Sequence, residues 1–305
     1  MDFWSRRSWL LGVLSAAAAG CGSKSAPKEQ APGALARGGW RDESFERSED
    51  QPDGQRALVL AAPEGEARPV LVALHGRGEA GRGLDAGARG WRDDYDLDAM
   101  IGHLAAGSLA SDHVGGMLDE DRLAKINASL AANPWQGLVV VCPYTPVPTG
   151  RDEEASRPFG RFVTGPLLER VTSTKAASAI ERKTTGIDGV SMGGRYALEL
   201  GFGFPDTFGA VGALQPAMRE SEADAFADRA LRASEHGPQQ IRLVSSEEDP
   251  FLEPTKALAR ALDRRKLEHR LLITKGPHDY VWNRGPGGAE LLIFHERALR
   301  GLPLA

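Results

Sequence analysis

Short apolar runs alternate with longer segments of helical periodicity along most of the chain. The runs 70–74 and 138–141 are apolar at every position, which is typical of strands buried on both faces of a parallel sheet. This alternation predicts an α/β fold, in which helices cover a mostly parallel sheet. The predicted strands are 56–61, 69–74, 138–142, 186–190, 210–214, 241–245 and 270–274, and the predicted helices are 160–182, 192–203, 220–233, 254–266 and 287–300.

One long segment interrupts this alternation. Residues 80–135, between the second and third predicted strands, are rich in Gly and Asp and have only partial helical periodicity. We expect an insertion that overhangs the carboxyl ends of the strands, where α/β proteins bind ligands. Residues 40–305 are then one folded domain that includes this insertion.

The first 21 residues have the composition of an export signal. Arg6 and Arg7 precede the apolar stretch 10–19, which is shorter than the 20 or so residues that a membrane-spanning helix needs. The paired arginines resemble a twin-arginine signal. The sequence Ala-Ala-Gly-Cys that ends at Cys21 resembles the lipobox of bacterial lipoproteins, in which cleavage leaves the cysteine lipidated. A plain cleaved signal is the alternative, because Ala18 replaces the usual leucine.

Residues 22–39 are small, contain Pro and Gly, and predict a flexible tether. Together with Cys21, this segment predicts an exported protein, anchored in a membrane by lipid and facing the periplasm or the cell surface.

Composition and charge limit the classes of protein to which this chain can belong. The 305 residues are 41% hydrophobic and 26% charged, as in ordinary globular proteins, with a net charge of −5. An acidic chain offers no electrostatic case for nucleic acid, which needs a basic face. The two cysteines, Cys21 and Cys142, exclude a disulfide scaffold, and no ligand spacing predicts a metal site.

The strongest chemical signal is Gly-Val-Ser-Met-Gly at 189–193, between a predicted strand and a predicted helix. This is the context of a nucleophile elbow, in which small neighbours let the chain turn sharply and expose the serine. Ser191 is the candidate nucleophile. The backbone N–H of Met192, at the start of the helix, is a candidate donor to an oxyanion. A glycine-rich turn with a passive serine is the alternative.

A second signal, His-Gly-Arg-Gly-Glu at 75–79, directly follows a predicted buried strand. A loop at this place can supply the other oxyanion donor, the N–H of Arg77. His75 and Gly76 are predicted to contact the substrate. The segment 76–81 also fits Gly-x-Gly-x-x-Gly, but a dinucleotide site needs a helix that begins at once, and two more glycines follow instead.

An acid and a histidine follow in the order that a serine nucleophile requires. Asp249 and His278 each follow a predicted strand, so their side chains can converge at one edge of the sheet. His278 would take the serine proton, and the carboxylate would hold the imidazole in the correct tautomer. Glu247 and Glu248 remain alternatives for the acid.

Three further side chains complete the expectations. Trp282 is predicted to line the substrate site, four residues after His278. His236 and His295 are predicted to be solvated.

Taken together, these motifs resemble the α/β-hydrolases, in particular the esterase group that includes esterase D, feruloyl esterases and polyhydroxyalkanoate depolymerases. The resemblance spans roughly residues 55–300 outside the 80–135 insertion. The segments that carry it are HGRGE at 75–79, GVSMGG at 189–194, FPDTF at 204–208, Asp249-Pro250 and GPHDYVW at 276–282.

This resemblance implies a three-layer α/β-hydrolase sandwich, with helices on both faces of a mostly parallel sheet and the insertion over the active site. It implies hydrolysis of a small-molecule or polymeric carboxylic ester through an acyl-enzyme on Ser191, without a cofactor. The acyl and alcohol groups of that ester do not follow from it. A serine peptidase of the same fold and a non-catalytic binding protein on this scaffold are the alternatives.

Overall fold

The computed structural model describes residues 39–62, 66–173 and 177–305. Contacts divide the chain into Met1–Pro32 and Gly33–Ala305. The predicted signal, Cys21 and the predicted tether up to residue 38 lie outside the described residues, and their roles stay predictions.

The described residues form an eight-stranded sheet in the order β1-β2-β4-β3-β5-β6-β7-β8. Neighbouring strands from β4 through β8 are parallel, whereas β2 pairs antiparallel with both β1 and β4. The mostly parallel sheet is therefore confirmed. The strands are β1 Trp40–Phe45, β2 Gln55–Leu60, β3 Val70–Leu74, β4 Val139–Pro143, β5 Thr185–Gly189, β6 Ala210–Leu214, β7 Gln240–Ser246 and β8 Arg270–Thr274.

The seven predicted strands lie within about two residues of their predicted ends, but β1 is not among them. Its sequence, WRDESF, holds three charged residues and no continuous apolar run. This strand lies at an edge of the sheet, so its side chains alternate between partly buried and exposed. Phe45 packs edge-on against Phe162, with 5.0 Å between ring centroids.

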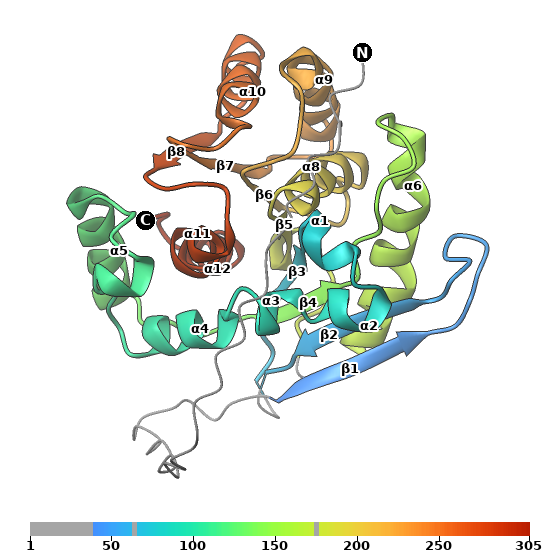
Figure 1. Cartoon of the computed structure of the whole chain (residues 1–305), viewed down its shortest axis with the longest axis horizontal. Coiled ribbons are helices and arrows are strands. Elements are labelled where there is room, and N and C mark those ends of the chain that lie inside the picture. The colour runs from blue at the N-terminus through green and yellow to red at the C-terminus, as the bar shows by residue number, and fades with distance from the viewer. Residues whose placement is uncertain (1–38, 63–65, 174–176) are drawn as a thin grey trace, which may run out of the picture. The chain divides into compact units, whose positions relative to one another are not determined.

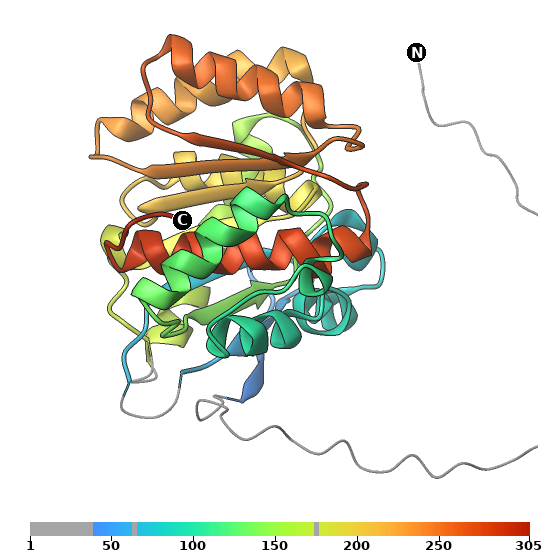
Figure 2. The same cartoon turned by 90° about the vertical axis from the view of Figure 1, so that its left-hand side faces the viewer.

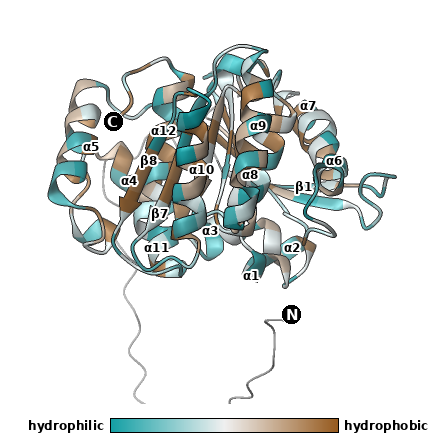
Figure 3. Ribbon diagram, turned by 90° about the horizontal axis from the view of Figure 1, so that it is seen from above, coloured by the Kyte–Doolittle hydropathy of each residue, from teal (hydrophilic) through white to brown (hydrophobic). Residues whose placement is uncertain are grey.

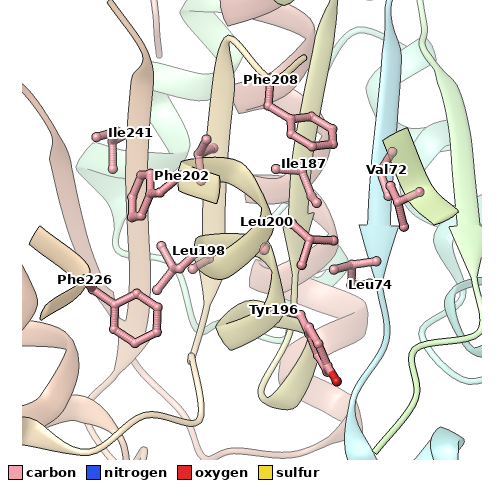
Figure 4. Close-up of a cluster of buried hydrophobic side chains, with 14 of the residues drawn as sticks. Val72, Leu74, Ile187, Tyr196, Leu198, Leu200, Phe202, Phe208, Phe226 and Ile241 are labelled. Carbon is pink, nitrogen blue, oxygen red and sulfur yellow. The ribbon is translucent and has the colours of Figure 1, made fainter. Parts of the chain in front are cut away.

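Side chains alternate across the sheet and form a core on each face. Val72 and Leu74 of β3 belong to the core beneath α6 (Glu153–Phe162), α8 (Met192–Gly203), α9 (Ala223–Ser234) and α10 (Leu252–Arg264). Leu71 and Ala73 belong to the core beneath α4 (Leu97–Ala105), α5 (Glu120–Ala132) and α12 (Gly288–Leu299). Figure 1 shows these two sets of helices on opposite sides of the sheet. Figure 4 shows the first core, where Tyr196 and other side chains of α8 pack on the strands. Every position of β3 and β4 is buried, as expected of strands covered on both faces.

The two helical layers complete the sandwich, with hydrophobic strands between helices that carry hydrophilic residues (Figure 3). The helices of these layers are α4 Leu97–Ala105, α5 Glu120–Ala132, α6 Glu153–Phe162, α7 Leu168–Thr172, α8 Met192–Gly203, α9 Ala223–Ser234, α10 Leu252–Arg264 and α12 Gly288–Leu299. Four short helices border the carboxyl ends of strands: α1 Arg77–Ala80, α2 Leu84–Ala88, α3 Gly90–Asp93 and α11 Tyr280–Trp282.

The helix predicted over 160–182 differs from the structure at both ends, because α6 begins at Glu153 and α7 ends at Thr172. It begins earlier because Asp152 caps α6 by accepting a hydrogen bond from the N–H of Ala155 at 2.9 Å. A π-helical turn, Val163–Leu167, then separates α6 from α7 and contains Pro166. Proline lacks the N–H that continues a regular helix, which accounts for the widened turn.

The segment 80–135 does not lie wholly over the carboxyl ends of the strands. Its helices α4 and α5 belong to the layer of α12, and Figure 2 shows α5 running across α12. Arg122 of α5 forms a bidentate ion pair with Glu290 of α12, with N–O distances of 2.7 and 2.6 Å. In this connection between β3 and β4, α1 directly follows β3, and Met117 O accepts from Lys275 N–H at 3.0 Å in the loop after β8, whereas α4 and α5 cover a face of the sheet.

Among the described residues, no helix has both the length and the apolar character needed to cross a bilayer. Cys142, in β4, is a buried free thiol.

Candidate active site

Ser191 lies on a sharp turn between β5 and α8. Its backbone has φ 58° and ψ −117°, a strained conformation that non-glycine residues rarely adopt. The turn is held from both sides, because Ser191 N–H donates to Leu214 O at 2.9 Å and a Cβ on Gly193 would lie 2.3 Å from Leu74 O. Position 193 therefore requires glycine, because any side chain there would clash with the backbone of β3. The turn has the geometry of the predicted elbow.

Asp249 and His278 are in direct contact. Asp249 Oδ1 lies 2.9 Å from His278 Nδ1 and also accepts from Phe251 N–H at 3.0 Å. The hydroxyl of Ser245 donates to the other carboxylate oxygen at 2.5 Å. The Asp249 side chain is fully buried, whereas 23% of the His278 side chain is exposed. Two donors, Phe251 N–H and the Ser245 hydroxyl, thus fix a buried carboxylate, which in turn orients one nitrogen of a solvent-accessible imidazole.

Glu247 and Glu248, the other candidates for the acid, are exposed. Their backbone N–H groups donate to Thr274 O and Gly276 O. The contact with His278 is made by Asp249, and this geometry favours Asp249 over both glutamates.

Ser191 and His278 lie on segments that are joined by a side chain we did not predict. Gln215 directly follows Leu214 at the carboxyl end of β6, and the carbonyl oxygen of Leu214 accepts from Ser191 N–H. The side-chain amide nitrogen of Gln215 donates to Pro277 O at 3.2 Å and to Ser246 Oγ at 2.8 Å. Within the described ranges no hydrogen bond joins the Ser191 hydroxyl to His278. Such catalytic hydrogen bonds are often long without a substrate.

Two backbone amides border the serine. Met192 begins α8, so its N–H belongs to the helix end that has no partner within the helix. Arg77 begins α1, directly after Gly76. A Cβ on Gly76 would lie 3.8 Å from the Cβ of Ser191, which places the 76–77 peptide beside the serine. The predicted oxyanion donors therefore lie on two segments that meet at Ser191.

His75 does not fit the predicted substrate contact. The residue is fully buried, and its Nε2 accepts from Thr145 N–H at 2.8 Å. Nδ1 must then carry the proton and donate it to Gly76 O at 2.9 Å. With both nitrogens engaged by backbone, His75 joins the ends of β3 and β4 and has no group left for a substrate.

The burial of His75 predicts a pH-dependent stability. Burial lowers the pKa of His75 from 6.5 to about 4. Between these values the unfolded chain binds a proton that the folded protein does not, so the free energy of unfolding falls as the pH falls below 6.5. Between pH 7 and pH 5 this residue is expected to remove about 2 kcal/mol. Urea unfolding at pH 5, 6 and 7 measures the loss.

The control for this prediction is His75→Gln, which keeps an acceptor for Thr145 and does not titrate. Its loss over the same pH interval should be smaller than that of the wild type by about 2 kcal/mol. Parallel losses in the two proteins would show that His75 is not the group responsible.

Trp282 is also placed differently from the prediction. Its side chain is fully buried, and its indole N–H donates to Thr274 Oγ1 at 2.7 Å. The ring therefore packs in the core under the loop of His278. The pattern of the sequence did not separate these roles, because an aromatic residue near a catalytic loop suits either.

The described residues also bear on cofactor and metal binding. Residues 39–62, 66–173 and 177–305 hold no group of three or more His, Cys, Asp or Glu side chains that could bind a metal ion. Cavities of about 700, 720 and 450 Å³ are lined by residues other than Ser191, Asp249 and His278. The site is therefore identified by side-chain geometry and not by a cavity.

Comparisons with known proteins concern the fold and the family of this chain. Residues 138–285 match the family described as "Putative esterase". No curated protein sequence matches the chain. Solved structures with a similar fold include a ferulic acid esterase, at 18% identity and TM-score 0.62, which covers 85% of this chain and 98% of that chain.

Two other similar structures are S-formylglutathione hydrolases. The one from Agrobacterium tumefaciens is 19% identical, covers 87% of this chain and 98% of that chain, and has a TM-score of 0.57. The one from Staphylococcus aureus is 11% identical, covers 83% and 97%, and has a TM-score of 0.56. At these identities the structures show the α/β-hydrolase fold. The family match over residues 138–285 supports a hydrolase of the esterase type.

Proposed function

We propose that this protein hydrolyses carboxylic esters through an acyl-enzyme on Ser191. The observation that carries the proposal is the Asp249–His278 contact at the same edge of the sheet as a serine held on a strained elbow. A buried carboxylate that fixes one imidazole nitrogen leaves the other nitrogen to act as a base. The family match over 138–285 supports the same chemistry.

The reaction proceeds in two acyl transfers. Ser191 Oγ attacks the ester carbonyl while His278 Nε2 takes its proton, and the N–H groups of Met192 and Arg77 stabilise the oxyanion. The intermediate collapses, and the alcohol leaves with the proton from His278. Water then attacks the acyl-enzyme with His278 as base, and the carboxylic acid leaves Ser191 free. These steps use the two side chains, the two backbone N–H groups and water.

The test is hydrolysis of p-nitrophenyl acetate and butyrate by residues 22–305, alongside methyl ferulate and an aminoacyl anilide. We expect turnover of the esters, and methyl ferulate is included because a similar structure is a ferulic acid esterase. Faster turnover of the anilide would identify a peptidase. A folded protein that turns over none of them and does not react with a fluorophosphonate would identify a binding protein on this scaffold.

We also propose that the mature protein is held at a membrane by lipid on Cys21 and faces the periplasm or the cell surface. The support is the sequence of the first 21 residues, with paired arginines, a short apolar stretch and a cysteine after small residues. An ester substrate would then be met outside the cytoplasm.

Cys21→Ser is expected to abolish incorporation of a palmitate analogue and to release the protein from the membrane fraction. Cys142→Ser is the matched control, because Cys142 is buried inside β4 and unavailable for lipidation. It should label like the wild type. A wild type that takes up no label and stays out of the membrane fraction would instead support the plain cleaved signal.

A further inference from the structure

A buried carboxylate that the proposed reaction does not use lies between the two catalytic loops. Glu79, in α1, is 1% exposed, and its two oxygens accept from Tyr280 OH at 2.7 Å and from Tyr95 OH at 2.5 Å. A buried charge is costly unless it is well satisfied, and here two phenols satisfy it.

Each tyrosine leads to a different part of the candidate site. Tyr95 OH accepts from Gly76 N–H at 3.2 Å. The cluster formed by Glu79, Tyr95 and Tyr280 therefore reaches the residue before Arg77. Tyr280 lies two residues after His278 and begins the short helix α11. The two rings are 5.8 Å apart, and Glu79 joins their hydroxyls. The cluster therefore connects the loop of one oxyanion donor to the loop of the base.

The glycines of the HGRGE motif make room for this cluster. A Cβ on Gly78 would lie 2.8 Å from Tyr280 OH, and one on Gly76 would lie 3.1 Å from Glu79 Oε2. A side chain at position 78 would thus displace the phenol from Glu79. The spacing Gly-x-Gly-Glu follows from the approach of two tyrosines to one carboxylate.

We propose that Glu79 is a positioning residue, which holds the loop of the Arg77 amide and the loop of His278 in one fixed relation through Tyr95 and Tyr280. This inference rests on the proposed function, because it assigns Glu79 a part in the same reaction. The oxyanion donors and the base must be aligned on one substrate carbonyl, and small misplacements lower the rate without loss of binding.

Both phenols remain donors under assay conditions. The hydrogen bond to Glu79 raises the pKa of Tyr280 to about 12, and burial, followed by the charge of Glu79, raises the pKa of Tyr95 well above its ordinary value. The cluster therefore keeps its hydrogen bonds from neutral to moderately alkaline pH. No deprotonation of these tyrosines should contribute to the pH profile below pH 10.

Tyr280→Phe is the direct test, because 44% of Tyr280 is exposed and the variant keeps the ring. We expect kcat for p-nitrophenyl butyrate to fall about 10-fold, with KM changed less than 2-fold. The rate constant for fluorophosphonate inactivation should fall in the same proportion, since it reports the alignment of the same groups. The melting temperature should change by less than about 3 °C.

Tyr144→Phe is the matched control. Its hydroxyl donates to Ala80 O at 3.1 Å, so it also binds α1, but it is not one of the two phenols that donate to the Glu79 carboxylate. We expect less than a 2-fold change in kcat. In a double-mutant cycle, Glu79→Gln with Tyr280→Phe should be no slower than Glu79→Gln alone, because both changes break one interaction.

Two results would overturn the positioning role while leaving the esterase in place. One is wild-type kcat and inactivation rate in Tyr280→Phe. The other is an equal loss in Tyr280→Phe and Tyr144→Phe, which would indicate general loosening of α1. A wild-type protein without Ser191-dependent ester hydrolysis would instead refute the proposed function, and the role of Glu79 in that reaction with it.

Discussion

Ser191→Ala is expected to reduce kcat for ester hydrolysis by about 10⁶-fold, to the level that substrate binding and oxyanion donors alone can provide. The reason is that no other side chain in the elbow can form the acyl-enzyme. Ser191 has an unusual backbone conformation that alanine must also adopt, and its Oγ makes no hydrogen bond to another described side chain. The fold should therefore survive the change. Steady-state rates with p-nitrophenyl butyrate measure the loss.

Fluorophosphonate labelling supplies the control for this variant. The wild type should gain one covalent adduct, located at Ser191 by peptide mass spectrometry, and the variant should gain none. Equal thermal melting of the two proteins would show that the loss is chemical. Hydrolysis that persists in Ser191→Ala, or an adduct at another serine, would move the nucleophile elsewhere.

Asp249→Asn is expected to lower kcat by about 10⁴-fold. The carboxylate now accepts from His278 Nδ1, Phe251 N–H and Ser245 OH, which requires acceptors on both oxygens. An asparagine offers one oxygen and one NH₂ group. An NH₂ that faces the ring would favour the tautomer with its proton on Nε2, and that nitrogen could not then accept the serine proton.

Glu247→Gln and Glu248→Gln are matched controls, because they remove the same charge at exposed neighbouring positions. Each should change kcat less than 2-fold. A large loss in either glutamine variant, with an active Asp249→Asn, would mean that the loop rearranges in solution and that a glutamate is the acid.

The sequence located the three proposed catalytic side chains because each follows an apolar strand. Carboxyl ends of neighbouring parallel strands meet at one edge of a sheet, so Ser191, Asp249 and His278 were expected together. The structure confirms the sheet and shows the Asp249–His278 contact. That rule concerns position along strands and does not depend on the details of packing.

The sequence did not predict which polar side chains are buried. His295 was predicted to be solvated, yet it is fully buried with Nε2 3.0 Å from Asp188 Oδ2. Its helix, α12, has the sheet on one side and α5 on the other, so even polar positions of this helix face the interior. His236 is closer to the prediction, with a side chain 45% exposed beside Asp206.

By itself the sequence determined the mostly parallel sheet, the elbow and the order of serine, acid and histidine, because these depend on local periodicity and on the ends of strands. Only the tertiary structure decided which polar side chains are enclosed and what they touch. Gln215 donates to Pro277 in the loop of His278, 62 residues further along the chain. Glu79 accepts from Tyr280, which is 201 residues away in the sequence. Such contacts depend on how loops from distant strands pack together, which no local pattern records.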